Sequence, residues 1–195
     1  MTIQIEKIHH VAYRCKDAKE TVQWYKKNLN MDFILAFAED YVPSTKAFDP
    51  YMHLFLDAGN GNVLAFFELP TQPEMGRDEN TPKWVQHIAL KVKDRTALIE
   101  AKAHLEANDI AVLGITNHGI FHSIYFFDPN GHRLELAYDD EKAAAKIALI
   151  TEQMKAEMLE QWSITKRAPQ HTQFLHADEL ENNTSTAKID AEWSI

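Results

Sequence analysis

Two histidines and two acids stand at comparable places in two similar parts of the chain, and together they could bind a metal ion. The segments HHVAYRCKD and QHIALKVKD match nearly position for position, with His10 and His87 separated by 87 − 10 = 77 residues. Glu68 and Glu135 come later in each part, each beside apolar residues. Imidazole and carboxylate groups are ligands for Fe(II), Mn(II), Ni(II) and Zn(II). These four residues are therefore the predicted metal ligands.

The number of ligands that bind decides between two kinds of chemistry. Two histidines and one carboxylate leave coordination positions open, which is typical of non-haem Fe(II) enzymes. A second carboxylate gives a four-ligand set that suits a Lewis acid better. Glu68 is the residue on which the choice depends, because it could be a ligand or a catalytic base. Both possibilities stay open at this point.

Glu135 lies in a predicted hairpin. Two short apolar runs, Ile124–Phe127 and Leu134–Ala137, are joined by the sequence Asp-Pro-Asn-Gly. Proline presets the backbone for a turn, and Asn-Gly accepts a positive φ. Side chains alternate along a strand, so Glu135 should point away from the face that its neighbouring leucines occupy. A carboxylate held this way on a rigid strand is a good candidate ligand or acid–base group.

The same order of elements is predicted twice, which makes the chain an internal repeat. Each matching segment reads as a strand, and Asp17 and Asp94 are placed to cap the helices that follow. The fold class is α+β, with two tandem βαβββ modules at residues 5–69 and 83–138. Side by side, the modules should form an eight-stranded cup-shaped sheet in which the four predicted ligands converge. The region 1–138 is then one domain, followed by a helix and a polar tail at 139–195.

Two further segments read as connections. Glu39–Tyr51 is polar and contains two prolines, which predicts a long loop that could act as a lid. Residues 70–82 contain three prolines and read as the linker between the modules. In the second module, Ile110–Leu113 is predicted to be a strand.

Composition excludes several classes of function. The chain has 195 residues and a net charge of −9, from 20 basic and 29 acidic residues, without a basic cluster for nucleic acid. Its apolar runs are shorter than the roughly 18 residues that a membrane span needs. The single cysteine, Cys15, fits a reducing compartment. We therefore expect a cytoplasmic protein that acts on a small molecule.

The duplicated unit, its two histidine segments and the sequence YFFDPNGHRLEL resemble the vicinal oxygen chelate superfamily. That superfamily includes glyoxalase I, extradiol ring-cleaving dioxygenases, methylmalonyl-CoA epimerase, and fosfomycin- and bleomycin-resistance proteins. The resemblance extends from about Ile5 to Tyr138. It is specific to the superfamily rather than to one activity. Two modules followed by a tail also resemble the one-domain form of the extradiol enzymes.

The resemblance to extradiol dioxygenases implies Fe(II) bound by His10, His87 and Glu135, with a catechol and O2 as substrates. It also implies that His118 and Tyr125 are catalytic and form hydrogen bonds with the bound oxygens. One departure is that Asn62 stands where these enzymes have an acid–base histidine. His53 or His122 are the candidates to replace that histidine. Four aromatic residues are candidate walls for a planar substrate, namely Phe37, Phe66, Phe121 and Phe126.

Two alternatives remain. In a glyoxalase I-like lyase or isomerase, Glu68 would be both ligand and base, with Mn(II), Ni(II) or Zn(II) as possible metals. In a drug-sequestering resistance protein, the cup would bind a small molecule without a metal. The dioxygenase with Fe(II) is the favoured interpretation.

The C-terminal region is predicted to contribute to assembly rather than to catalysis. Residues 139–161 read as a helix with one apolar stripe, which predicts a docking surface and a homodimer. The stripe consists of Ile147, Ile150, Met154, Met158 and Trp162. The polar tail that follows contains His171 and His176, which we expect to be solvated.

Overall fold

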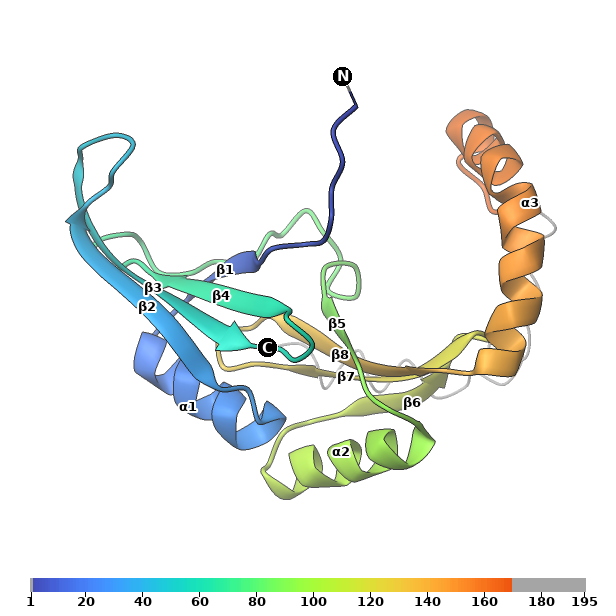
Figure 1. Ribbon diagram of the computed structural model, residues 1–195, viewed down its shortest axis with the longest axis horizontal. Coiled ribbons are helices and arrows are strands. Elements are labelled where there is room, and N and C mark those ends of the chain that lie inside the picture. Colours follow the sequence, from blue (N-terminus) through green and yellow to red (C-terminus); the bar gives the residue numbers. More distant parts are fainter. Residues whose placement is uncertain (1, 170–195) are drawn as a thin grey trace. The chain divides into compact units, whose positions relative to one another are not determined.

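The computed structural model of the chain describes residues 2–169, and within 142–153 it describes only some of the side chains. This part contains the strand and helix order βαβββ twice, followed by a last helix (Figure 1). The first module consists of β1 (Val11–Cys15), α1 (Ala18–Leu29), β2 (Phe33–Tyr41), β3 (Phe48–Asp57) and β4 (Val63–Glu68). The remaining elements are β5 (Ile88–Lys91), α2 (Arg95–Ala107), β6 (Leu113–Asn117), β7 (Phe121–Phe127), β8 (Arg133–Asp139) and α3 (Glu141–Thr165).

The strands form two four-stranded sheets with the same internal order. The first sheet has the order β1-β4-β3-β2 and the second has the order β5-β8-β7-β6, so the first strand of each module lies beside the last. β1 is parallel to β4, whereas β3 is antiparallel to its two neighbours. The predicted α+β class, with two βαβββ modules and a C-terminal helix, is confirmed. The eight strands are divided between two sheets rather than joined in one continuous sheet.

The chain folds as two compact units. The first unit contains Met1–Leu90, His104–Ile110 and Phe127–Leu134. It therefore combines the first sheet and α1 with the turn that joins β7 to β8. The second unit contains the rest of the described residues.

The predicted helix caps are present. The Asp17 carboxylate accepts a hydrogen bond from the backbone N–H of Glu20 at 2.7 Å, which satisfies one of the free donors at the start of α1. Asp94 caps α2 in the same way, through the N–H of Ala97 at 2.9 Å. α1 ends at Asn30, whose φ of 54° is in the left-handed region that such helix ends favour.

One face of the first sheet packs against α1. The ring centroids of Phe66 in β4 and Tyr25 in α1 are 5.1 Å apart, and both side chains are fully buried. Cys15 points to the same face, and burial raises the pKa of its thiol to about 11. The thiol is therefore protonated at neutral pH, which makes it a poor nucleophile.

The opposite face of the first sheet carries two histidines. Arg14 pairs with Phe67, and Phe67 pairs with His53 on the next strand. Because side chains alternate along a strand, His10 lies on this face as well, four residues before Arg14. We call this surface the histidine face and define it by His10, His53, Phe55 and Phe67.

The segment Glu39–Tyr51 is not the long loop that its polarity and prolines suggest. β2 continues to Tyr41 and β3 already begins at Phe48, so only a short turn remains. Pro50 is accommodated because the pairing of β2 with β3 is irregular at this point, and proline is tolerated at bulges. The prediction of a lid here was wrong.

The second module differs from the prediction in one strand. β6 begins at Leu113 and ends at Asn117, so the strand placed at Ile110–Leu113 starts three residues later than expected. The N–H of Ile110 instead bonds the carbonyl of Leu105 as α2 ends. These residues close the helix rather than start the strand.

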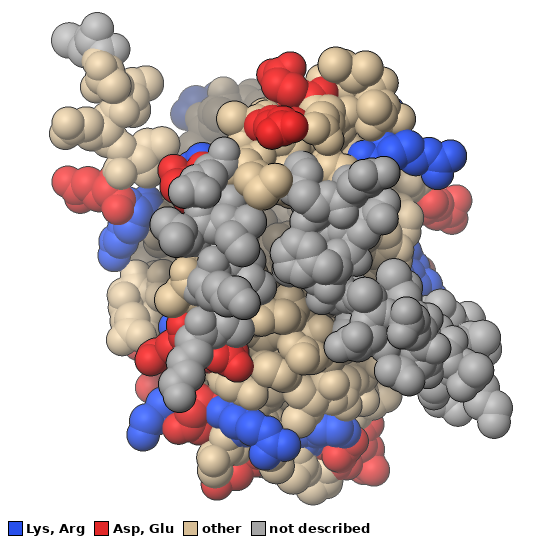
Figure 2. Space-filling view, turned by 90° about the vertical axis from the view of Figure 1, so that its right-hand side faces the viewer, with Lys and Arg blue, Asp and Glu red and all other residues tan. Residues whose placement is uncertain are grey.

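α3 is present, as predicted, and no helix in the described part of the chain is long and apolar enough to cross a membrane. Met154 and Met158 are half-buried and Trp162 is 49% exposed. The side chains of Ile147 and Ile150, and the tail with His171 and His176, lie outside the described residues. On the face drawn in Figure 2, the described basic side chains lie among acidic ones and form no continuous basic area.

Candidate metal and substrate site

Glu135 is a buried carboxylate whose position is fixed by two hydroxyl groups. Its side chain is only 2% exposed. Ser123 Oγ and Tyr125 Oη both donate hydrogen bonds to Glu135 Oε1, the latter at 3.1 Å. All three residues belong to adjacent strands of the second sheet, and Ser123 and Tyr125 are two positions apart on β7, so they share a face. The carboxylate is thus held in one orientation on a rigid support.

Tyr125 links this carboxylate to a histidine. The distance between Tyr125 Oη and His118 Nε2 is 2.8 Å. His118 is also in ring contact with Phe121, with centroids 4.6 Å apart. The three predicted site residues of the second module, His118, Tyr125 and Glu135, therefore form one hydrogen-bonded chain. Sequence reasoning missed Ser123, although its place two residues before Tyr125 was a usable signal.

His87 has the environment of a preorganised ligand. Its Nδ1 lies 2.9 Å from the carbonyl oxygen of Val85, which can only accept, so Nδ1 carries the proton. This tautomer leaves the lone pair on Nε2. Metal-binding histidines are usually oriented in this way, by donating their other ring N–H to a carbonyl or carboxylate.

His10 stands immediately before β1 on the histidine face. Its Nδ1 is 2.8 Å from Nδ1 of His9, so the two rings share one hydrogen bond. Its ring centroid lies 5.7 Å from that of Phe55 and 6.1 Å from that of His53. Burial, and then the nearby His10, lower the pKa of His53. His53 is thus a neighbour of His10 that separation in sequence conceals.

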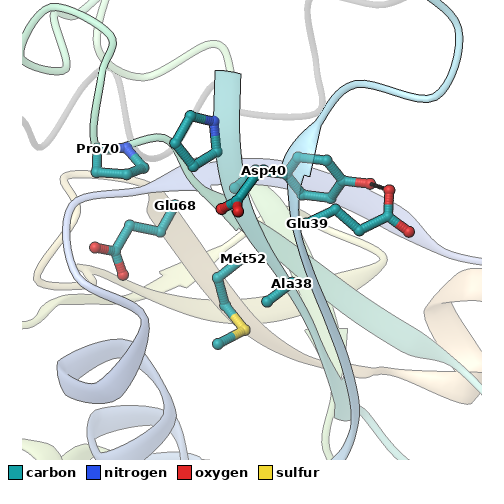
Figure 3. A pocket seen from close by; sticks show the side chains of 8 residues that line it. Ala38, Glu39, Asp40, Met52, Glu68 and Pro70 are labelled. Carbon is teal, nitrogen blue, oxygen red and sulfur yellow. Dashed lines mark hydrogen bonds between the residues drawn. The ribbon is translucent and has the colours of Figure 1, made fainter. Parts of the chain in front are cut away.

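Glu68 is in a different environment from the other predicted ligands. It is two residues after Phe66 on β4, so it points to the face that α1 covers, away from His10. Its Oε2 accepts a hydrogen bond from the N–H of Ala18 at 2.7 Å. A carboxylate at a helix N-terminus is stabilised by the helix dipole. Figure 3 shows Glu68 with Met52 in a cleft of about 410 Å³ on this face.

This placement predicts that Glu68 stabilises the fold and does not contribute to metal binding. Replacing Glu68 with Ala should lower the free energy of unfolding by about 1 kcal/mol, because the start of α1 loses an acceptor. Urea unfolding measures this loss, and elemental analysis should find the metal content unchanged. Glu39→Ala is the matched control, since Glu39 lines the same cleft but bonds only Tyr51. A loss of bound metal in Glu68→Ala would contradict this role.

Of the candidates for the missing histidine, only one lies on the histidine face. Asn62 itself bonds the carbonyl of Gly59 within the β3–β4 turn at 2.9 Å. His122 alternates with Ser123 on β7, so it lies on the face opposite Glu135, where it stacks on Tyr138 at 5.1 Å.

The candidate aromatic walls divide in the same way. Phe37 is in ring contact with Phe55 of the histidine face, and Phe121 contacts His118. Phe66 and Phe126 are fully buried, and the register places them on the opposite faces of their sheets. The expectation that Phe66 and Phe126 line the substrate site was therefore wrong.

The donor chemistry of these residues fits a divalent metal. No three His, Cys, Asp or Glu side chains are grouped closely enough to hold an ion among residues 2–169. The fit rests instead on the individual donors. His87 has a fixed tautomer, and Glu135 is a buried carboxylate oriented by two hydroxyls. Such supported imidazole and carboxylate groups are suited to Fe(II) and other divalent ions of similar preference.

The repeated modules and their sheet order agree with a sequence comparison. The family model of the Glyoxalase/Bleomycin resistance protein/Dioxygenase superfamily matches residues 7–136. This range is most of the chain and contains both βαβββ modules. The chain belongs to this superfamily.

A curated relative comes from Bacillus subtilis (strain 168) and is named "Putative ring-cleaving dioxygenase MhqA". It is 29% identical over 142 residues, which are 71% of this chain but only 42% of the relative. The chain thus matches less than half of the length of that protein.

Solved structures show the same fold at low sequence identity. A glyoxylase/bleomycin resistance protein/dioxygenase domain from Frankia sp. EAN1pec has a TM-score of 0.56 and 18% identity, over 70% of this chain and 99% of that one. The trypanothione-dependent glyoxalase I of Leishmania major has a TM-score of 0.52 and 23% identity, over 82% and 99%. These likenesses concern the fold and do not distinguish the activities.

Proposed function

We propose that the protein is a metal-dependent ring-cleaving dioxygenase of the extradiol type, which uses Fe(II) and O2 to open a catechol. The proposed ligands are His10, His87 and Glu135. The observation that carries the proposal is the placement of Glu68 on the α1 side of the first sheet, bonded to Ala18 N–H. Without Glu68, the donors that remain are two imidazoles and one carboxylate, the set typical of non-haem Fe(II) oxygenases. The relative named as a ring-cleaving dioxygenase supports the same activity.

The bound iron would supply coordination positions for the catechol oxygens and O2. The protein's own residues have separate tasks. Ser123 and Tyr125 keep the Glu135 carboxylate from rotating by donating to Oε1. His118 Nε2, at 2.8 Å from the Tyr125 hydroxyl, can accept or return a proton at that oxygen. Tyr125 can in turn donate a hydrogen bond to a substrate oxygen.

The overall reaction needs no further reductant. The carbon–carbon bond beside one hydroxyl of the catechol breaks, and both atoms of O2 enter the product. One of the two carbons becomes a carboxylic acid and the other becomes a carbonyl, with the remaining hydroxyl retained as an enol. The four electrons that reduce O2 come from the catechol itself.

The lyase alternative depends on a carboxylate from the first module. Glu68 was the candidate for that role, and its hydrogen bond to the start of α1 speaks against it. The sequestering alternative does not need the carboxylate that Ser123 and Tyr125 orient in the second module. Neither alternative has a specific observation in its favour.

Oxygen uptake distinguishes these functions. Protein loaded with Fe(II) without air should consume O2 when a catechol is added, and a coloured ring-opened product should appear. The same protein loaded with Ni(II) or Zn(II) should not isomerise a hemithioacetal. Isomerisation of the thiol adduct without any catechol-dependent oxygen uptake would contradict the proposal.

Two broader expectations stay predictions. A homodimer is consistent with the exposed Phe33, Ile34 and Phe37 on β2, which is the outermost strand of the first sheet. The cytoplasmic location rests on the single cysteine alone.

A further inference from the structure

His53 has a buried ring nitrogen without a hydrogen-bond partner. Its Nε2 has almost no accessible surface and no partner among the described residues. An unsatisfied buried polar atom costs free energy, and in native structures it usually marks a site that a ligand, ion or water fills. The nitrogen therefore needs an explanation that the folded chain by itself does not provide.

Two aromatic rings hold the imidazole in place. The His53 ring is stacked on Phe67, with centroids 3.7 Å apart and planes at 17°. It also contacts Phe55, at 4.2 Å. The ring is half-buried on a central strand of the sheet, so both its position and its orientation are restricted. A group fixed in this way is suited to hold one atom of a ligand.

The imidazole lies beside the histidine that we propose as a metal ligand. His53 and His10 are on the same face, with ring centroids 6.1 Å apart. Between their strands the face is formed by two small residues, Ala12 and Ala65, which pair with each other. Small side chains at this point leave room above the sheet for a planar group. Phe55 borders the same area, since it pairs with Ala65.

The internal repeat indicates where the His53 side chain is aimed. The two hairpin turns end at Gly61 and Gly131, an offset of 131 − 61 = 70 residues. Applied to the strands, this offset relates His53 to position 123 and Ala65 to position 135. In the second module these two positions are in direct contact, because Ser123 Oγ bonds the Glu135 carboxylate. In the first module an imidazole and an alanine occupy them, so the imidazole faces a place where no carboxylate stands.

We propose that His53 Nε2 forms a hydrogen bond with a hydroxyl oxygen of the aromatic substrate, which makes His53 a substrate-binding residue. This role rests on the proposed dioxygenase function. It would replace the histidine that is absent at Asn62, whose amide is engaged in the β3–β4 turn. The preferred ligand is a planar phenolic ring, which packs beside Phe55 and Phe67 while one oxygen meets Nε2.

Binding of 4-nitrocatechol to the Fe(II)-loaded full-length protein without air tests this role, because its absorbance reports binding without turnover. His53→Phe keeps an aromatic ring for stacking but removes the nitrogen, and it should weaken binding about tenfold, the effect of losing one buried hydrogen bond. His53→Gln places an amide near the position of Nε2 and should stay within about threefold of the wild type. His122→Phe is the matched control, since His122 also has a buried unpartnered nitrogen but lies on the face opposite Glu135. It should bind like the wild type.

The outcomes separate the two proposals. Equal binding by His53→Phe and wild type, at equal iron content, overturns the role of His53 and leaves the dioxygenase intact. Equal weakening in His53→Phe and His53→Gln also overturns it, because the hydrogen bond would then not be the cause. If His53→Phe does not fold, His53→Asn, whose amide is too short to reach, takes its place in the comparison. Failure of the wild type to bind 4-nitrocatechol overturns both proposals.

Discussion

Replacing His87 with Ala should lower the affinity for Fe(II) by about 100-fold or more. Loss of a residue that only supports a ligand already costs 10- to 100-fold in metal affinity, so loss of a ligand itself should cost at least as much. His10→Ala and Glu135→Ala should have effects of similar size, because a set of three donors has no spare member. Competition with a chelator of known affinity measures the change, and elemental analysis confirms the metal content.

His104→Ala is the control for these ligand substitutions. His104 is an exposed histidine of α2 whose Nε2 approaches only the carbonyl of Lys27, at 3.3 Å. Its loss should leave iron binding unchanged. Unchanged metal content in both His10→Ala and His87→Ala would rule out the proposed site.

The second large effect is expected at the turn between β7 and β8. Asp128→Ala should lower the free energy of unfolding by about 3 kcal/mol. The Asp128 carboxylate is buried and accepts hydrogen bonds from the Tyr25 hydroxyl at 3.0 Å, from the N–H and the side chain of Asn130 at 2.9 and 3.0 Å, and from the N–H of His132 at 2.8 Å. Burial and the nearby Asp128 raise the pKa of Tyr25 well above its usual value, so the hydroxyl stays a donor. The substitution would leave these donors buried without an acceptor.

Asp57→Ala provides the comparison for Asp128. Asp57 also precedes a hairpin turn, but it is exposed and its carboxylate accepts only from the N–H of Gly59, at 2.8 Å. It should cost less than about 1 kcal/mol in the same urea titration. Similar losses in the two variants would mean that the buried network contributes no more than an ordinary turn.

The repeat, the helix caps and the hairpin could be predicted because each depends on local sequence. Asp17 and Asp94 cap helices wherever they occur in that context, and Asn-Gly or Pro-Asn-Gly turns bend the chain irrespective of its partners. The Asp128 network could not be predicted in the same way. Its donors come from α1 and from residues near the turn itself, and only the folded first unit brings Tyr25 to Asp128.

The assignment of Glu68 illustrates what the choice of alignment decides. Anchoring the repeat on the histidines gives an offset of 77 residues and suggests that Glu68 and Glu135 are equivalent. Anchoring it on the turns gives 70, which pairs Glu135 with Ala65 (135 − 70 = 65). The strand register supports the second alignment, because Ala65 lies on the histidine face and Glu68 does not. The turns lie directly next to the strands in question, so they are the better anchor.

Residues in continuous apolar runs could not be assigned to a face from the sequence. Phe66 and Phe67 are adjacent, and only the pairing with Arg14 and His53 determines that Phe67 is on the histidine face. His53 is a related case, since its importance comes from neighbours on other strands. A missing histidine at position 62 indicated that a replacement was needed, but not which histidine provides it.

The product of the reaction tests the central claim most directly. Fe(II)-loaded protein should be mixed with a catechol and oxygenated buffer, and the product should be analysed by mass spectrometry while oxygen consumption is recorded. The proposed function predicts one O2 consumed for each catechol and a product whose mass equals that of the catechol plus one O2, with none formed by Glu135→Ala. A product that has lost two hydrogens without gaining oxygen, as in simple oxidation to a quinone, would contradict it.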